Sequence, residues 1–207
     1  MENMDAPGDG NEKGSLRDSL DKYVRLNNIY LLIISKYKDY IEEKEALSVA
    51  ELPTLVTPKA SMVMRKAMDI RGEFDSYDYD ANFPDAARKA FDFVSKDIGD
   101  AALPIEFWLM PEETLRFMMG DVTDKSILLC SILIALGNPS SKVVVVSKDS
   151  TRSIYVYYEF GGSIVMMDVE NGQIVEFGNK EEMLKAFNLD DESAAYEFND
   201  QMYIDIS

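Results

Sequence analysis

Residues 120–137 read GDVTDKSILLCSILIALG and decide the fold of this 207-residue chain. Asp121 and Thr123 are residue types that cap the start of a helix, and Gly137 is typical of a helix end. Between them, Ile127–Ala135 is apolar around almost the whole helical circumference. A helix of that kind has to be buried on all sides, so the stretch predicts the central helix of a globular domain.

The residues that follow predict a sheet. Lys142–Ser147 is a valine-rich buried strand. Two further runs flank Gly161-Gly162, a pair typical of a tight hairpin turn, and are expected as strands at Ser153–Phe160 and Ser163–Asp168. The remaining elements expected here are a short strand, a helix and a last strand, at Gln173–Phe177, Lys180–Phe187 and Met202–Ile206.

The residues that precede the central helix predict further helices. Thr57-Pro58 has a capping residue followed by proline, which favours a helix that runs to about Arg71. Another helix is expected from Pro84 or Asp85 to about Ile98, and a short one from Pro111. The loop Arg71–Asn82 alternates Asp and Tyr but lacks the Gly and terminal Glu of an EF-hand calcium loop, so we expect a solvated loop. Helices followed by a buried helix and an antiparallel sheet predict an α+β fold.

The first part of the chain has a different pattern. Residues 1–14 are polar and acidic and predict a mobile tail. Ser15–Leu47 has apolar residues at helical spacing and predicts a long helix, in which Ile29–Ile34 is apolar on every side. The simpler interpretation is a helix that packs against the core, and the alternative is a helix for docking or homo-oligomer formation. The expected domains are therefore a tail at 1–14, a helical extension at 15–54 and a main domain at 55–207.

Composition excludes several classes of function. With 38 acidic and 21 basic residues the net charge is −17, which disfavours binding to nucleic acids and anionic membranes. The longest apolar runs are too short to cross a bilayer, and no signal peptide is expected at the start. The single cysteine, Cys130, excludes an internal disulfide and suits a cytoplasmic protein. The chain has no histidine, so catalytic triads that use imidazole and zinc sites of the Cys and His type are excluded.

Several segments together resemble the transglutaminase-like superfamily, particularly its archaeal-type branch. They are Trp108–Leu115, the central helix, the hairpin Ser153–Asp168 and the closing Tyr196–Asp200, so the resemblance covers about residues 55 to 200. It implies a papain-like core in which a central buried helix packs on an antiparallel sheet. In that family a Gly-Asp-Cys motif starts the central helix, and two strands supply a histidine and an aspartate.

The resemblance also implies that the catalytic residues are lost. The cysteine position is Val122 and the histidine position aligns best with Ser153, although a shift in register would place it at Tyr155 or Arg152. Only the carboxylate remains, as Asp168. Valine has no nucleophilic atom, and the chain has no imidazole base.

Other residues offer weak substitutes for these groups. Cys130 lies more than two helical turns beyond Val122 among apolar neighbours, so we expect an unreactive thiol. Thr123 and Ser126 carry hydroxyls near the helix start but lack a base. Three carboxylates, those of Asp121, Asp124 and Asp168, could gather around a hard cation. For Asp121 and Asp124 the simpler interpretation is an electrostatic role at the helix N-terminus.

The sequence thus predicts a catalytically inactive transglutaminase-like domain with a binding or scaffold role toward a protein partner, and with no cofactor. The alternative is a hydrolase assisted by carboxylates or a metal, which would use the three aspartates named above in the same cleft.

Overall fold

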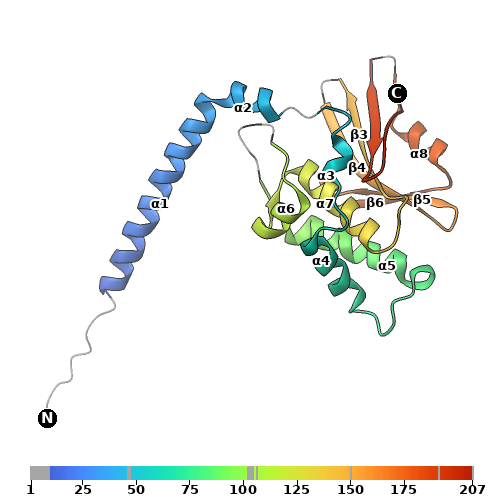
Figure 1. The fold of residues 1–207 in the computed structure, drawn as a ribbon, viewed down its shortest axis with the longest axis horizontal. Helices are drawn as coiled ribbons and strands as arrows, with labels where there is room; N and C mark the ends of the chain where they lie inside the picture. Colours follow the sequence, from blue (N-terminus) through green and yellow to red (C-terminus); the bar gives the residue numbers. More distant parts are fainter. Residues whose placement is uncertain are drawn as a thin grey trace, which may run out of the picture. The chain divides into compact units, whose positions relative to one another are not determined.

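A six-stranded antiparallel sheet carries the larger part of the chain in the computed structural model (Figure 1). The strand order is β6-β5-β4-β3-β7-β8, and every neighbouring pair is antiparallel. The strands are β3 (Lys142–Lys148), β4 (Thr151–Phe160), β5 (Ser163–Asp168), β6 (Gln173–Phe177), β7 (Ala194–Phe198) and β8 (Tyr203–Asp205). Strand β7, which lies between β3 and the edge strand β8, was not predicted from the sequence.

The structure describes residues 10–45, 48–101, 105, 107–149, 151–190 and 192–206. They form two units. Helices α1 (Gly10–Lys36) and α2 (Lys38–Glu45) belong to the first, and all elements from α3 onward belong to the second, which we call the globular unit. The boundaries expected from sequence, after residues 14 and 54, stay predictions.

In the globular unit, helices cover both faces of the sheet (Figure 1). The larger core lies between one face and a layer that contains the buried helix α7 (Val122–Ala135). The same layer holds α3 (Leu52–Leu55), α4 (Ser61–Arg71), α5 (Tyr79–Asp92), the π-helical turn η1 (Phe93–Asp97) and α6 (Pro111–Phe117). A smaller core lies on the opposite face, where α8 (Lys180–Ala186) packs. Two short parallel strands, β1 (Gly99–Asp100) and β2 (Met119–Gly120), pair with each other, and β2 runs directly into α7.

Helix α7 is the centre of this core, as its sequence predicts. Every residue from Thr123 to Leu133 is buried. Just beyond its end, the Asn138 amide donates to the Tyr79 hydroxyl and to the Glu159 carbonyl, both at 3.0 Å. The C-terminal end of α7 is therefore fastened to α5 and to β4.

Some helix boundaries differ from the prediction. Thr57 does not cap α4, because its N–H donates to the Ser131 hydroxyl and the helix begins four residues later. Helix α5 begins at Tyr79 rather than near Pro84, since the Asp78 carboxylate accepts from the Ala81 N–H. Of the predicted tail, residues 1–9 lie outside the described part of the chain, and Gly10 already begins α1.

Helices α1 and α2 belong to a unit of their own, so both interpretations of this segment, core packing and docking, stay predictions. None of the core residues in the described part of the chain comes from α1 or α2. Many large apolar side chains of α1 are exposed, with 70% of Tyr23 and 68% of Leu32 accessible to solvent. Among the described helices, none is both long and apolar enough to span a bilayer.

Candidate functional site

The start of α7 is closed by two aspartates that cap each other. The Asp121 carboxylate accepts from the Asp124 N–H at 2.9 Å, and the Asp124 carboxylate accepts from the Asp121 N–H at 3.0 Å. The second oxygen of Asp124 accepts from the Leu109 N–H at 2.7 Å. Both carboxylates predicted as metal candidates on this helix therefore satisfy backbone donors.

Burial raises the pKa of Asp124 from 3.8 to about 6. The negative charge of Asp121 adds to this rise, whereas the N–H donors of Asp121 and Leu109 oppose it. The side chain is fully buried, so its ionised form is held only by these backbone groups.

Val122 lies at the first position of α7, where a nucleophile would gain most from the helix N-terminus. Its side chain packs against the main core and carries no polar atom. The hydroxyl of Ser126 donates to the Val122 carbonyl at 2.7 Å, so it serves the helix backbone. Thr123 is buried in the first turn of α7.

Ser153 does not face Val122, because β4 presents alternate residues to opposite faces of the sheet. Ile154 packs in the main core with α7, whereas Tyr155 packs in the smaller core with α8. Ser153 pairs with Val146, which also belongs to the smaller core. Paired residues on antiparallel strands share a face, so Ser153 and Tyr155 both lie on the α8 face.

Asp168 is also directed away from α7. Its neighbour Met167 packs in the main core, so strand alternation places Asp168 on the other face. Its carboxylate accepts from the Glu170 and Asn171 N–H groups and from the Asn171 amide. The aspartate expected beside a catalytic histidine therefore stabilises the turn after β5.

Arg152 is the alternative that the strand places on the α7 face. Its guanidinium carbon lies 5.2 Å from the centre of the Trp108 ring, next to the segment whose Leu109 N–H binds Asp124. Arginine stays protonated at any pH at which a protein folds, so it cannot act as a general base. Strand pairing thus brings Arg152, and neither Ser153 nor Asp168, toward the start of α7.

The other candidates have structural surroundings. Cys130 is fully buried, and burial raises the pKa of its thiol far above its ordinary value. Within the described ranges, no three acidic, cysteine or histidine side chains are grouped so that they could hold a metal ion. The predicted gathering of Asp121, Asp124 and Asp168 is therefore absent from this part of the chain.

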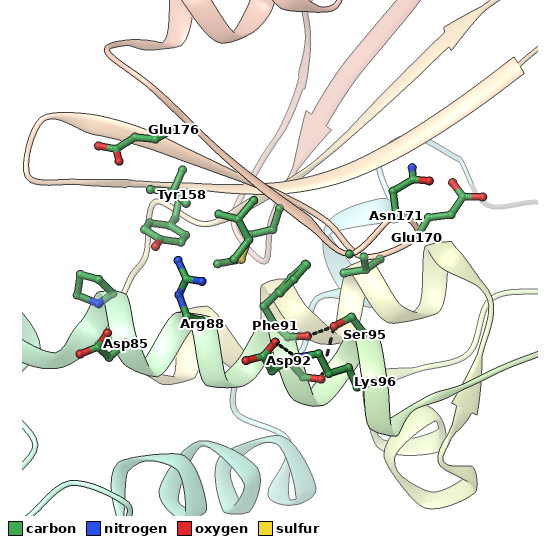
Figure 2. Close-up of a pocket in the computed structure, with 16 residues that line it drawn as sticks. Asp85, Arg88, Phe91, Asp92, Ser95, Lys96, Tyr158, Glu170, Asn171 and Glu176 are labelled. Carbon is green, nitrogen blue, oxygen red and sulfur yellow. Dashed lines mark hydrogen bonds and ion pairs between the residues drawn. The ribbon is translucent and has the colours of Figure 1, made fainter.

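A cleft of about 700 Å³ opens on the α7 side of the sheet, between α5–η1 and strands β4 to β6 (Figure 2). Apolar side chains from both walls line it, namely Phe91, Val165, Met167, Val169 and Ile174. The Arg88 guanidinium and the Tyr158 hydroxyl point toward each other across the cleft (Figure 2). Burial raises the pKa of Tyr158 to about 12, although the positive charge of Arg88 opposes the rise, so its hydroxyl stays neutral near pH 7.

This cleft was not predicted from the sequence, since its residues come from separate elements and form no motif. One feature of the sequence could have indicated it, namely charged residues that directly follow apolar ones in the lining elements. Arg88 follows Ala87 on α5, and Glu176 follows Val175 on β6. Its rim carries the carboxylates of Asp85, Glu170 and Glu176.

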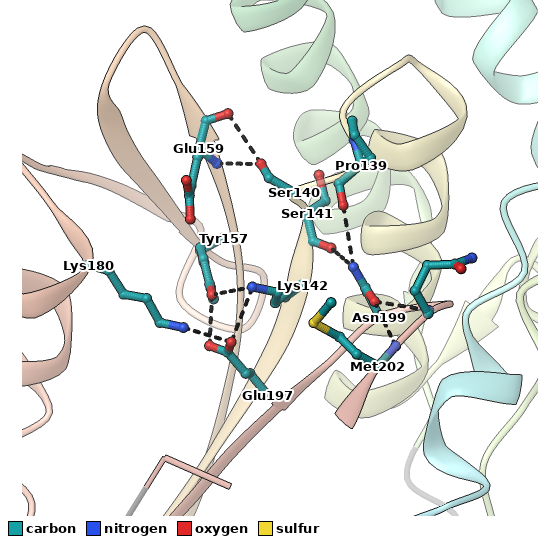
Figure 3. Close-up of polar contacts among 11 residues, drawn as sticks. Pro139, Ser140, Ser141, Lys142, Tyr157, Glu159, Lys180, Glu197, Asn199 and Met202 are labelled. Atoms are coloured by element: carbon teal, nitrogen blue, oxygen red, sulfur yellow. Dashed lines mark hydrogen bonds and ion pairs between the residues drawn. The ribbon is translucent and has the colours of Figure 1, made fainter. Parts of the chain in front are cut away.

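A buried ionic cluster on the opposite face of the sheet was missed as well (Figure 3). Glu197 on β7 is fully buried and accepts from the Tyr157 hydroxyl and the Lys180 ammonium, both at 2.7 Å. The Lys142 ammonium lies 3.2 Å from the same carboxylate. Burial alone would raise the pKa of Glu197, but its hydrogen bonds with Lys180 and Tyr157 and the nearby positive charges hold it below its ordinary value. These groups satisfy one another, so the cluster fastens α8 and β7 to the sheet.

Comparison with known proteins supports the fold alone. No family model and no curated protein matches this chain. Among solved structures, Legionella pneumophila LapG in an EGTA-treated form aligns with a TM-score of 0.50 and 12% identity, over 79% of this chain and 88% of LapG. A second LapG structure aligns with a TM-score of 0.49 and 13% identity, over 77% and 88% of the two chains. A candidate cysteine protease from Cytophaga hutchinsonii aligns with a TM-score of 0.44 and 13% identity, over 78% and 54%.

The fold is transglutaminase-like and papain-like. This confirms the α+β class and the central helix packed on an antiparallel sheet. At these levels of identity, the likeness carries no information about activity, substrate or ligand.

We predict that Gly120→Ala destabilises the protein. A Cβ atom at residue 120 would lie 2.8 Å from the Cβ atom of Asp124 and would force apart the caps at the start of α7. We expect a loss of about 1–3 kcal/mol in the free energy of unfolding, measured by urea denaturation. Gly72→Ala is the matched control, because its nearest contacts would be at 3.4 Å. Equal stability of the two variants would contradict the prediction.

We predict that the pH dependence of stability reports the buried Asp124 carboxyl. Because the pKa in the folded state is raised to about 6, this group contributes most below its ordinary pKa of 3.8, and the contribution is lost as the pH rises through 6. In urea unfolding, the free energy of unfolding of the wild type should therefore fall relative to that of Asp124→Asn as the pH rises from 4.5 to 7. A difference that stays constant or shifts the other way would show that the carboxyl is not destabilised by burial.

Proposed function

We propose that this chain is a non-catalytic transglutaminase-like protein of the archaeal type, which acts in the cytoplasm by binding a protein partner. The observation that carries the proposal is Val122 at the head of α7, where the family resemblance calls for the nucleophile. The fold presents the N-terminus of a buried helix at this point, but the side chain there has no atom that could attack a carbonyl group.

The surroundings of Val122 support the same conclusion. The chain has no histidine, and the charged residue that β4 directs toward this region is Arg152, which cannot accept a proton. Cys130, the single thiol of the chain, is enclosed by the core and held in its protonated form. A thiol of this kind also suits a reducing compartment such as the cytoplasm.

The cleft beside α5 is the surface that we assign to the partner. Its apolar lining includes the partly buried side chains of Val165 and Ile174, and the exposed Arg88 guanidinium offers N–H donors to a carbonyl or carboxylate of the bound segment. The carboxylates of Asp85, Glu170 and Glu176 at the rim, together with the net charge of −17, favour a segment with basic side chains around an apolar anchor.

The first test concerns catalysis. We expect only background rates with peptide, ester and glutamine-containing substrates, since Val122 offers no nucleophile and backbone N–H groups occupy the two carboxylates at the start of α7. The measurement compares product formation with and without a cysteine-specific alkylating reagent, and Cys130→Ala serves as the control for any thiol chemistry. Turnover that the reagent abolishes would contradict the proposal.

The second test concerns the cleft. Peptides are selected from a displayed random library on the full chain and their affinities are measured by titration calorimetry. We expect enrichment of apolar peptides with basic residues, and a loss of tenfold or more in affinity for Arg88→Ala. Arg65→Ala is the matched control, because Arg65 is an exposed arginine on α4 outside the cleft. Selection of no peptide, or equal affinity for both variants, would overturn the assignment of the cleft.

A further inference from the structure

Helix α1 and its continuation α2 carry many exposed apolar side chains. Eleven large apolar side chains between residues 20 and 40 are at least 38% accessible, namely Leu20, Tyr23, Val24, Leu26, Ile29, Tyr30, Leu31, Leu32, Ile33, Tyr37 and Tyr40. Ile29 and Leu32 lie on the opposite side of the helix from the others, and the remaining nine, at roughly 100 Å² each, expose on the order of 900 Å² of apolar surface. One partner in a stable protein–protein interface buries about 800 Å². The helix therefore exposes enough surface to form an interface.

The spacing of these residues follows the heptad repeat of a coiled coil. Steps of three and four residues alternate along one face of the helix, which we call the seam, through Leu20, Tyr23, Asn27, Tyr30, Ile34, Tyr37 and Ile41. The hydrogen bonds of the helix continue across Tyr37, whose N–H bonds to the Ile33 carbonyl while its own carbonyl accepts from Ile41. Backbone hydrogen bonds thus connect α1 to α2 across the turn residue Tyr37. In heptad terms Asn27 occupies an a position between two d positions.

A surface hollow lies on this seam. It has a volume of about 380 Å³ and is lined by Tyr23, Val24, Leu26, Asn27 and Tyr30. Four of these residues are spaced as i, i+3, i+4 and i+7, which is the set that forms a hole in knobs-into-holes packing. In a parallel, in-register pair of helices, each a residue enters a hole in the other helix. Four residues of that other helix form the hole: the preceding d and g residues, the a residue at the same level and the next d residue. For the a residue Asn27, that hole is Tyr23, Leu26, Asn27 and Tyr30.

We infer that two copies of this chain associate through α1 and α2 as a parallel, in-register pair of helices. The Asn27 side chains of the two copies then face each other, and each amide both donates and accepts a hydrogen bond. A single asparagine at an a position fixes the register of a two-stranded coiled coil, because any shift leaves it buried against apolar groups without a partner. The apolar positions on either side of the seam widen the contact. This inference is independent of the proposed function of the globular unit.

The test measures the mass of the full-length chain by light scattering and by sedimentation at several concentrations. We expect twice the chain mass of 23.4 kDa for the wild type and for Ser35→Glu, and the single chain mass for Ile34→Glu. The two variants introduce the same charge at adjacent positions, one on the seam and one on the polar face. Thermal unfolding verifies that the globular unit stays folded in both.

A monomeric wild type would overturn the inference and would indicate that the helix packs within its own chain. Equal masses for the two variants would also overturn it, and so would a wild type larger than a dimer.

The direction of the pair is tested by cysteine cross-linking. Cys130 is fully buried and can be kept. Under mild oxidation, Asn27→Cys should form a disulfide-linked dimer rapidly, while Asn28→Cys, one residue off the seam, should not. A dimer in solution without a cross-link at residue 27 would overturn the parallel register.

Discussion

The reciprocal capping of Asp121 and Asp124 is the interaction on which the globular unit depends. Helix α7 is buried from Thr123 onward, so the free N–H groups of its first turn need partners inside the protein. The two carboxylates supply them, and Asp124 also accepts from Leu109, which fixes the segment before α6. Gly120 leaves the space that lets the two caps approach. The carboxylates that cap the start of α7 therefore also hold the neighbouring segment at Leu109 in place.

The same constraint determines what the head of α7 can do. Both aspartates are occupied by backbone donors, so they are poor candidates for ligands or bases. In a transglutaminase-like fold the first turn of this helix is the position where chemistry can occur, but here Val122 fills it with a methyl-bearing side chain. The N-terminus of the helix would stabilise a negatively charged nucleophile at this position, but only a residue with a nucleophilic atom could use that stabilisation.

The sequence predicted the fold well wherever one segment carried the signal. The apolar run Ile127–Ala135 and the Gly161-Gly162 turn each decide their own local structure, so α7 and the hairpin were placed correctly. The face of Ser153 was not predictable in the same way, because a shift of one residue reverses every side chain of a strand and the alternation in Ser153–Phe160 is weak. The cleft and the cluster around Glu197 are built from residues distant in sequence, so no local sequence pattern predicts them.

The buried Glu197 cluster has a consequence for how the chain folds. Strand β7 pairs with β3 and not with β6, the strand that precedes it in sequence, so the chain has to close a long loop before this pairing forms. A slip of one residue would turn Glu197 toward the apolar core under α7, far from Lys142 and Lys180. That misaligned pairing would bury an uncompensated charge and dissolve again quickly. The cluster therefore favours the native register of the pairing between β3 and β7 over one shifted by a single residue.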